Sequence, residues 1–224
     1  MRIAIYNSKG GAGKTPIATN IALDREYAIG TNEAFHVFDS FITDERLLSL
    51  DLTEAFPVIP DDVDIVFDLA GAISQHSNSI TSAIAQADLV IVPILNEVKS
   101  LNSGVGTLRE ISRLAGFHAD ILVAATKLQK QHGEHFLKSE WRQSRDYRNI
   151  GAAIRAAGFD IPVLPLKFSK VFDVIFEKEM SIAQLCEADP LARFTYRDVA
   201  RQFDEIYDFI DGVRHAKQKR SVSV

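Results

Sequence analysis

The chain has 224 residues, of which 46% are hydrophobic and 25% are charged, and its formal net charge is −5. These values are ordinary for a globular domain that buries a full core, and the acidic balance excludes a global attraction to nucleic acid. The single cysteine, Cys186, excludes a disulfide framework and a cysteine-based zinc site within one chain. We expect one cytoplasmic domain, because no apolar run approaches the roughly 20 residues that cross a bilayer and the first residues predict a strand, not a signal peptide.

The first predicted elements are a strand, a glycine-rich loop and a helix. Ile3–Tyr6 is a short apolar run, and Ile17–Leu23 has apolar residues at helical spacing. Between them lies SKGGAGKT, residues 8–15, whose glycines let backbone amides converge on an anion at a helix N-terminus. This order predicts a phosphate-binding loop in which Lys14 reaches the β- and γ-phosphates and the Thr15 hydroxyl holds Mg²⁺. The alternative is a glycine-rich turn with an incidental lysine.

One position departs from the strict pattern G-x-x-x-x-G-K-[ST], and a second position is informative. Ser8 stands at the first glycine, and Lys9 adds a second lysine to the loop. The loop therefore resembles that of the deviant Walker A ATPases, the ParA/MinD group, which reads KGGxGK[ST]. The resemblance implies ATP and Mg²⁺ as cofactors and nucleotide contacts from Lys9, Gly10, Gly11, Ala12, Gly13, Lys14, Thr15 and Pro16.

The same resemblance implies a homodimer that depends on ATP, in which Lys9 reaches the nucleotide of the partner subunit. Lys9 and Lys14 would then stabilise charge during attack of water on the γ-phosphorus. Pro16 stands where the family usually has a second Ser or Thr. Proline is tolerated in the first helical turn, but a hydroxyl that touches the α-phosphate is lost.

A short strand is expected near Tyr27–Ile29, and a core strand at Phe35–Phe38 that ends at Asp39. An aspartate at the carboxyl end of a parallel strand lies in the ligand crevice, and the resemblance makes Asp39 the first residue of a D-x-D-type segment, with catalytic and metal-binding roles. A helix cap is the alternative role. In the family the second aspartate orients the attacking water, and Phe41 stands in its place, so we expect slow hydrolysis. Asp44 is the nearest carboxylate that could substitute.

The next segment predicts a further metal ligand. The leucines from Leu47 to Leu52 suggest a short helix, and Ile65–Asp68 is an apolar strand that ends in an aspartate, the Walker B pattern. Asp68 would hold a magnesium-bound water opposite Thr15. The following Leu69–Ala72 resembles the family's switch segment, whose backbone senses the γ-phosphate.

The rest of the chain continues the alternation of strands and helices. Helices are expected at Ser79–Ala87 and Ser100–Leu114, with strands at Asp88–Pro93, Ile121–Ala125 and Ile161–Leu166. In the family, residues after the last two strands lie beside the adenine base. The resemblance therefore implies contacts from Thr126, Lys127, Pro165, Leu166 and Lys167.

Two basic segments have two interpretations each. Arg142, Arg145 and Arg148 are three residues apart and fall near one helix face, which is either solvated or contacts DNA or a partner. The final helix, about Thr195–Lys217, leads into a basic tail over residues 214–224. Its Lys217, Lys219 and Arg220 either solubilise the chain end or touch DNA phosphates. Membrane anchoring is disfavoured, because the tail has few bulky apolar residues.

Together these elements predict an α/β fold, a doubly wound, mostly parallel sheet of the P-loop NTPase type, as a single domain over residues 1–224. The resemblance implies a ParA-like ATPase of plasmid DNA segregation or positioning, similar to small plasmid partition proteins or the StbB-type proteins of conjugative plasmids. It would work with a DNA-binding adaptor protein, and with non-specific DNA at the nucleoid. The alternatives are a nucleotide-gated binding module with little hydrolysis and a metabolic P-loop ligase or kinase.

Overall fold

The computed structural model describes residues 1–72, 77–114, 117–137 and 139–222. Within them the strands form one seven-stranded sheet in the order β3-β2-β4-β1-β5-β6-β7, and every pair is parallel. The strands are β1 (Arg2–Ile5), β2 (Ala28–Thr31), β3 (Leu47–Ser49), β4 (Ile65–Asp68), β5 (Leu89–Ile94), β6 (Asp120–Leu128) and β7 (Val163–Lys167). A parallel sheet needs crossover helices that cover both faces. The predicted doubly wound α/β fold is confirmed.

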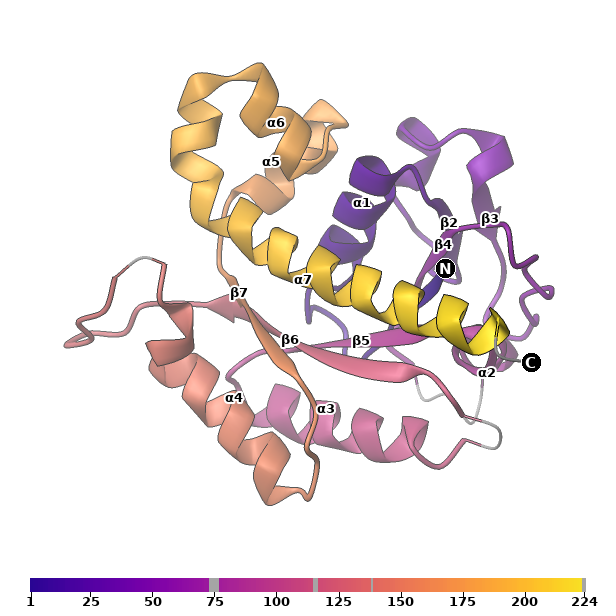
Figure 1. Cartoon of the computed structure of the whole chain (residues 1–224), viewed down its shortest axis with the longest axis horizontal. Helices are drawn as coiled ribbons and strands as arrows, with labels where there is room; N and C mark the ends of the chain where they lie inside the picture. The colour runs from indigo at the N-terminus through magenta and orange to yellow at the C-terminus, as the bar shows by residue number, and fades with distance from the viewer. Residues whose placement is uncertain (73–76, 115–116, 138, 223–224) are drawn as a thin grey trace.

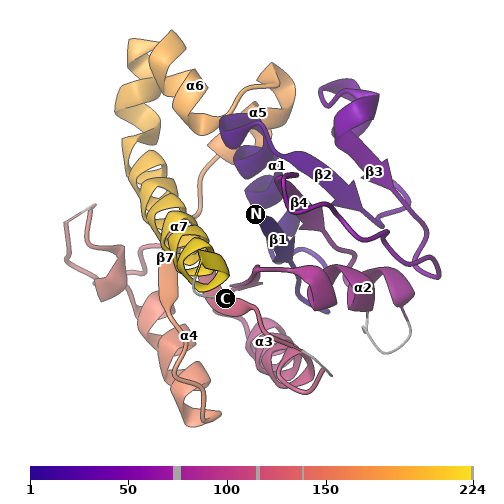
Figure 2. The same ribbon diagram turned by 45° about the vertical axis from the view of Figure 1, so that its right-hand side comes forward.

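Seven α-helices fall within the described residues: α1 (Lys14–Arg25), α2 (Asn78–Gln86), α3 (Val98–Ile111), α4 (Arg145–Ala156), α5 (Val171–Lys178), α6 (Ile182–Ala188) and α7 (Pro190–Val222). One core cluster joins α1, α5, α6 and α7 to one face of the sheet, and a second joins α2, α3 and α4 to the other, as Figures 1 and 2 show. Successive strand residues alternate between the clusters. In β1, Ile3 and Ile5 belong to the first and Ala4 to the second.

Two elements between β2 and β4 differ from the sequence prediction. The strand predicted for Phe35–Phe38 is wrong: Phe35 is 99% exposed, and Phe38–Ser40 is a 3₁₀ helix. The helix predicted from Leu47 is also wrong, since Leu47–Ser49 forms the edge strand β3. Both sides of β2 are already paired, one with β3 and the other with β4, so Phe35–Phe38 has no place beside it as a strand. The apolar side chain of Phe38 is buried in the core under α1 without being part of a strand.

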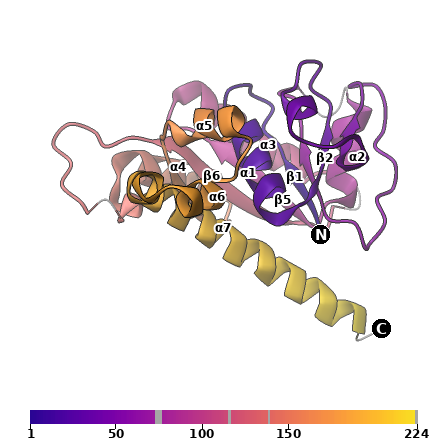
Figure 3. The ribbon, with the colours of Figure 1, turned by 90° about the horizontal axis from the view of Figure 1, so that it is seen from above.

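The C-terminal segment is one continuous helix of 33 residues, visible from above in Figure 3. The basic tail predicted after residue 214 is part of α7 as far as residue 222, and residues 223–224 lie outside the described ones. Arg214 donates to Asp64 at 2.7 Å, and the Lys217 ammonium lies 2.9 Å from Asp88. The end of α7 is therefore held against the N-terminal edges of β1, β4 and β5.

In the described part of the chain, no helix combines the length and the apolar character needed to cross a lipid bilayer.

The pair of Lys217 and Asp88 predicts a pH-dependent contribution to stability. Partial burial opposes the shift, but the hydrogen bonds from Lys217 and from the Arg2 backbone lower the pKa of Asp88. A carboxylate with a lowered folded pKa stabilises the fold above its unfolded pKa of about 3.9, and the contribution is lost as pH falls through the folded pKa. We expect Lys217→Met to cost about 1 kcal/mol at pH 7, and the difference to shrink towards pH 3.

Denaturant unfolding of wild type and Lys217→Met between pH 7 and pH 3 measures this difference. Gln218→Met, at an exposed position on the same helix, serves as the control. A cost that stays constant over this range would contradict the role of the Asp88 carboxylate.

Candidate functional site

The glycine-rich loop joins the end of β1 to the first residue of α1, and its conformation requires glycine at two positions. Gly11 has φ 76° and Gly13 has φ 95°, in the left-handed region that side chains disfavour. Two hydrogen bonds hold the loop to α3. The Ser8 backbone N–H donates to the Thr107 hydroxyl at 3.2 Å, and the hydroxyls of Ser8 and Ser103 are hydrogen-bonded at 2.9 Å. Ser8, at the place of the usual first glycine, thus anchors the loop.

Lys14 and Asp68 are buried charges on neighbouring elements. Lys14 is 5% exposed, and burial lowers its pKa, while the charges of Asp68 and Glu33 oppose that shift. Asp68 ends β4 and is 1% exposed. Burial raises the pKa of Asp68 to about 7, although the nearby Thr15 hydroxyl and the Lys14 charge act in the opposite direction. Within the described residues, neither Asp68 oxygen has a hydrogen-bond partner of good geometry.

An unsatisfied buried carboxylate is costly unless a ligand pairs with it. Oxygen atoms of a carboxylate and a hydroxyl are the ligands that Mg²⁺ prefers, usually with waters and phosphate oxygens completing the shell. The carboxylate of Asp68 and the hydroxyl of Thr15 supply such oxygen ligands beside the loop. The predicted metal residues Thr15 and Asp68 therefore fit a magnesium ion.

The segment after Asp68 packs directly on the glycine-rich loop. A Cβ added to Gly71 would lie 2.7 Å from the Gly10 nitrogen and 3.0 Å from the Lys9 carbonyl carbon. The same segment is tied to the end of β2, because the Asn32 side chain accepts from the Ala70 N–H at 2.6 Å. Movement of the segment after β4 would therefore move the loop.

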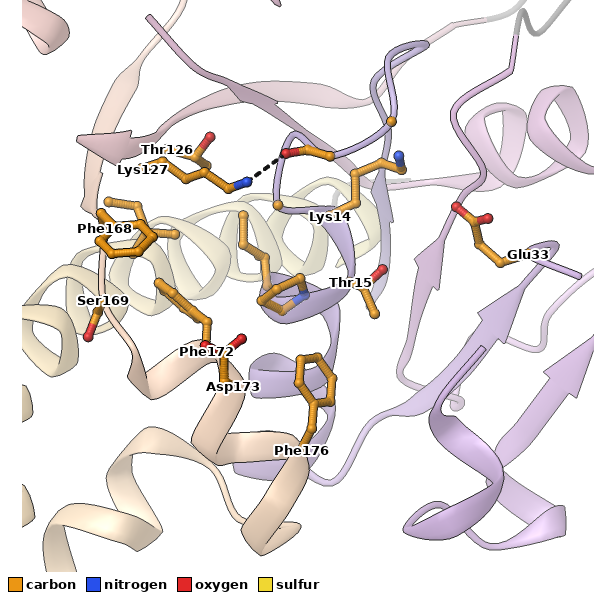
Figure 4. Close-up of a pocket in the computed structure, with 16 residues that line it drawn as sticks. Lys14, Thr15, Glu33, Thr126, Lys127, Phe168, Ser169, Phe172, Asp173 and Phe176 are labelled. Carbon is orange, nitrogen blue, oxygen red and sulfur yellow. Dashed lines mark hydrogen bonds between the residues drawn. The ribbon is translucent and has the colours of Figure 1, made fainter. Parts of the chain in front are cut away.

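A cavity of about 370 Å³ lies between the loop, α1 and α5, and Figure 4 shows the residues that line it. Of the predicted nucleotide contacts, nine line this cavity: Gly10, Gly11, Gly13, Lys14, Thr15, Pro16, Thr126, Lys127 and Leu166. The predicted contacts that do not line it are Lys9, Ala12, Pro165 and Lys167.

Thr126 and Lys127, at the end of β6, hold the loop as well as lining the cavity. The Thr126 hydroxyl donates to the Ala12 carbonyl at 2.9 Å, and the Lys127 ammonium donates to the Gly11 carbonyl at 3.0 Å. Lys127 adopts φ 52°, an uncommon conformation for a residue with a side chain. These contacts link the far side of the cavity to the phosphate loop.

Lys9 does not line the cavity in the single chain. Its ammonium lies 2.9 Å from the carboxylate of Glu97, the residue before α3. The hydrogen bond and charge of Lys9 lower the pKa of the exposed Glu97 carboxyl. The side chain that the sequence assigns to a partner's nucleotide is thus on the surface.

The predicted catalytic carboxylates Asp39 and Asp44 do not lie in the cavity. Asp39 is exposed on a 3₁₀ helix, 3.7 Å from His36, and Asp44 is exposed at the start of another. Asp39 does not end a strand, so the basis for its role as a first switch aspartate is wrong. The Phe41 ring packs against those of Phe38 and Phe176, at centroid distances of 6.0 and 6.4 Å, which is a core role.

The carboxylate that does line the cavity belongs to Glu33, which the sequence analysis did not identify. It lies two residues after the end of β2, lines the cavity, and acts electrostatically on both Lys14 and Asp68. Figure 4 shows its side chain near Lys14 and Thr15, on the side away from Phe168 and Phe172. The signal that could have identified Glu33 was the short strand expected near Tyr27–Ile29. In the structure that strand extends to Thr31 and so ends two residues before Glu33.

Aromatic residues from a distant part of the sequence line the other end of the cavity. Phe168, Phe172 and Phe176 come from the end of β7 and from α5, together with Ser169 and Asp173. Figure 4 shows the rings of Phe172 and Phe176 beside the start of α1. The cavity therefore has a polar end at the loop and an apolar end suited to a flat ring.

The predicted basic residues lie in two separate places. Arg142, Arg145 and Arg148 come together at the N-terminal end of α4, around a second cavity of about 500 Å³. Lys217, Lys219 and Arg220 lie at the C-terminal end of α7, at the opposite side of the molecule in Figure 1. Arg142 is paired with Glu205 at 2.6 Å, and Lys217 with Asp88.

No protein-family model and no curated protein matches the sequence, but solved structures resemble the fold. An ATP complex of a McdA variant from Cyanothece is 15% identical, covers 94% of this chain and 96% of its own, and gives a TM-score of 0.64. The cell division ATPase MinD from Pyrococcus furiosus is 15% identical over 92% and 99%, with a TM-score of 0.54. A putative plasmid partition protein from Borrelia burgdorferi bound to AMPPNP is 11% identical over 91% and 98%, with a TM-score of 0.50. At these identities the likeness establishes a shared fold, the P-loop NTPase fold predicted from the sequence.

The contact between Gly71 and the loop predicts a site-specific effect of one methyl group. In Gly71→Ala the added Cβ displaces the Gly10 backbone, and overpacking of this kind costs about 1–3 kcal/mol. We expect the affinity for ATP with Mg²⁺ to fall about tenfold or more, as measured by calorimetry. Gly106→Ala is the control, because nothing lies within 4 Å of that Cβ on the exposed side of α3. Equal affinities of the two variants would contradict the contact.

Proposed function

We propose that the chain is an ATPase of the ParA/MinD type that binds ATP with Mg²⁺ in the cavity beside α1. The observation that carries the proposal is that Lys14 and Thr15 line one end of a cavity of nucleotide size and that both act on the buried, unsatisfied carboxylate of Asp68 behind them. The fold likeness to an ATP complex and to an AMPPNP complex supports it.

In this proposal the loop amides and Lys14 bind the phosphates, and the base end of the nucleotide lies among Thr126, Leu166 and Phe172. Asp68 and Thr15 would hold the magnesium ion, which when bound neutralises phosphate charge. Glu33 is the carboxylate placed to accept a hydrogen bond from a water that attacks the γ-phosphorus. Lys14 stabilises the charge that develops on the phosphate oxygens.

The oligomeric part of the proposal rests on Lys9. Its exposed ion pair with Glu97 is worth little in water, so the lysine is free to exchange that partner for a phosphate of a second subunit. An ATP-dependent homodimer follows, in which each Lys9 completes the other subunit's site. Such a switch would serve plasmid segregation or positioning together with a DNA-binding adaptor, in the cytoplasm or on the nucleoid.

A second candidate is a nucleotide-gated module with negligible turnover. It is favoured by one observation: at the end of β2 the chain has Asn32 and Glu33 and no aspartate. Asn32 is buried and holds the Ala70 backbone, so Glu33 alone is left to orient the water.

Calorimetric titration of the full chain with ATP and Mg²⁺ tests the binding step. We expect Lys14→Ala to weaken affinity at least tenfold, because it removes the only buried ammonium that lines the cavity among the described residues. Lys178→Ala, at an exposed position outside the cavity lining, should bind as wild type does. Unchanged affinity in Lys14→Ala would remove the central assignment.

Steady-state phosphate release separates the two candidate functions. Glu33→Gln keeps the size of the side chain and removes its charge, so an ATPase should lose at least tenfold in turnover while it still binds ATP. The module predicts no turnover in either protein, with or without DNA. Full turnover in Glu33→Gln would exclude Glu33 as the water-orienting group.

A further inference from the structure

A third cavity, which the nucleotide site does not use, opens between the β6–α4 connection and the start of α7. Its volume is about 400 Å³, and we refer to it as the aromatic groove. Its walls are Lys130, Phe136, Trp141, Lys167, Phe194, Thr195, Arg197 and Asp198.

The groove combines aromatic walls with an excess of positive charge. The rings of Phe136 and Trp141 meet edge to face with centroids 5.5 Å apart. The Lys130 ammonium lies 4.7 Å from the Phe136 ring centroid, and that of Lys167 lies 5.8 Å from the ring of Trp141. Three cations and one carboxylate line the groove, although the whole chain carries a net charge of −5. The local charge therefore favours an anionic occupant.

Large apolar side chains are exposed at its rim. Phe194 is 75% exposed, and Leu191, three residues earlier on α7, is 69% exposed. Across the groove Leu137 is 68% exposed and lines an adjoining cavity that shares Lys130 and Phe136. A cluster of exposed apolar side chains around a hollow marks an interaction surface, and none of these three lines the nucleotide cavity.

The burial and pairing of the cations in and near the groove favour a peptide over a nucleic acid. Lys167 is sunk in the groove, with its side chain 17% exposed and paired with Asp198 at 3.5 Å. The neighbouring Arg142 is held by Glu205, so the cations do not form the open basic stripe that a phosphate backbone contacts. We propose that the aromatic groove docks a segment of a partner protein in which an acidic residue adjoins aromatic or aliphatic ones. The apolar side chains would lie on the rings, and the carboxylate would pair with Arg197, whose side chain is 55% exposed and whose Nε lies 3.9 Å from the Asp198 carboxylate.

The groove is joined to the nucleotide cavity through one stretch of backbone. Leu166 and Phe168 line the nucleotide cavity, whereas Lys167, between them, lines the groove. Such alternation is what an extended strand imposes. A nucleotide that shifts Leu166 and Phe168 therefore shifts Lys167 as well. This coupling, unlike the groove itself, rests on the proposed function.

The test uses the full-length protein and a displayed library of random heptapeptides, followed by fluorescence anisotropy of the enriched peptides. We expect enriched sequences to carry Asp or Glu within two positions of Phe, Trp or Leu. Their affinity should fall at least tenfold for Arg197→Glu and for Phe194→Ala, both surface substitutions. Arg113→Glu, after α3 and outside the groove lining, should change it less than twofold. A peptide with its acid replaced by lysine should regain binding to Arg197→Glu.

Enrichment of peptides without acidic residues, or binding that is insensitive to Arg197→Glu, would overturn the proposal. So would a labelled DNA duplex that binds through Arg197 when no peptide does. Repeating the anisotropy with ATP and Mg²⁺ tests the coupling separately. Peptide binding by a protein that binds no nucleotide would leave the groove intact and refute the ATPase assignment, whereas nucleotide binding without any change in peptide affinity would refute the coupling alone.

Discussion

Two opposite charges, Lys14 and Asp68, are buried side by side where two central strands end, and the rest of the site is arranged around them. Burial disfavours both ionised groups, as the lowered pKa of Lys14 and the raised pKa of Asp68 show. Neither Asp68 oxygen is satisfied among the described residues. A site of this kind stabilises the fold poorly by itself, but it is prepared for a ligand that brings both negative phosphates and a cation.

The sheet order makes this juxtaposition unavoidable. β1 lies between β4 and β5, and its residue Ile5 is in register with Asp68. The chain passes from β4 on one side of β1 to β5 on the other, which is the switch point at which parallel sheets bind ligands. The loop after β1, the carboxylate after β4 and the first turn of α1 must therefore meet there. The aromatic groove lies further along the same edge, beyond β6 and β7, which is how one strand can serve two cavities.

The parts of the site that could be predicted are those encoded locally. The loop from Lys9 to Thr15 carries its own turn chemistry, and Asp68 follows an apolar run that can only be a buried strand. Glu33 could not be placed, because β2 contains Gly30, which reads as the end of a strand. In the structure Gly30 is needed inside the strand: a Cβ there would lie 2.5 Å from the Phe67 ring. Phe35–Phe38 has a strand-like pattern but is not a strand, because β3 and β4 occupy both sides of β2. The aromatic end of the cavity comes from α5, more than 150 residues from the loop, and no local pattern indicates such contacts.

The most direct test of the central claim measures the free energy of unfolding of wild type and Asp68→Asn, alone and with ATP and Mg²⁺. Without ligand the two should differ by less than about 1 kcal/mol, because relief of carboxylate desolvation offsets the lost attraction to Lys14. At ligand concentrations near 100 times the Kd, wild type should gain about 2.7 kcal/mol and Asp68→Asn should gain little. Equal stabilisation of both proteins by ATP and Mg²⁺ would contradict the claim that the buried carboxylate exists to hold the metal.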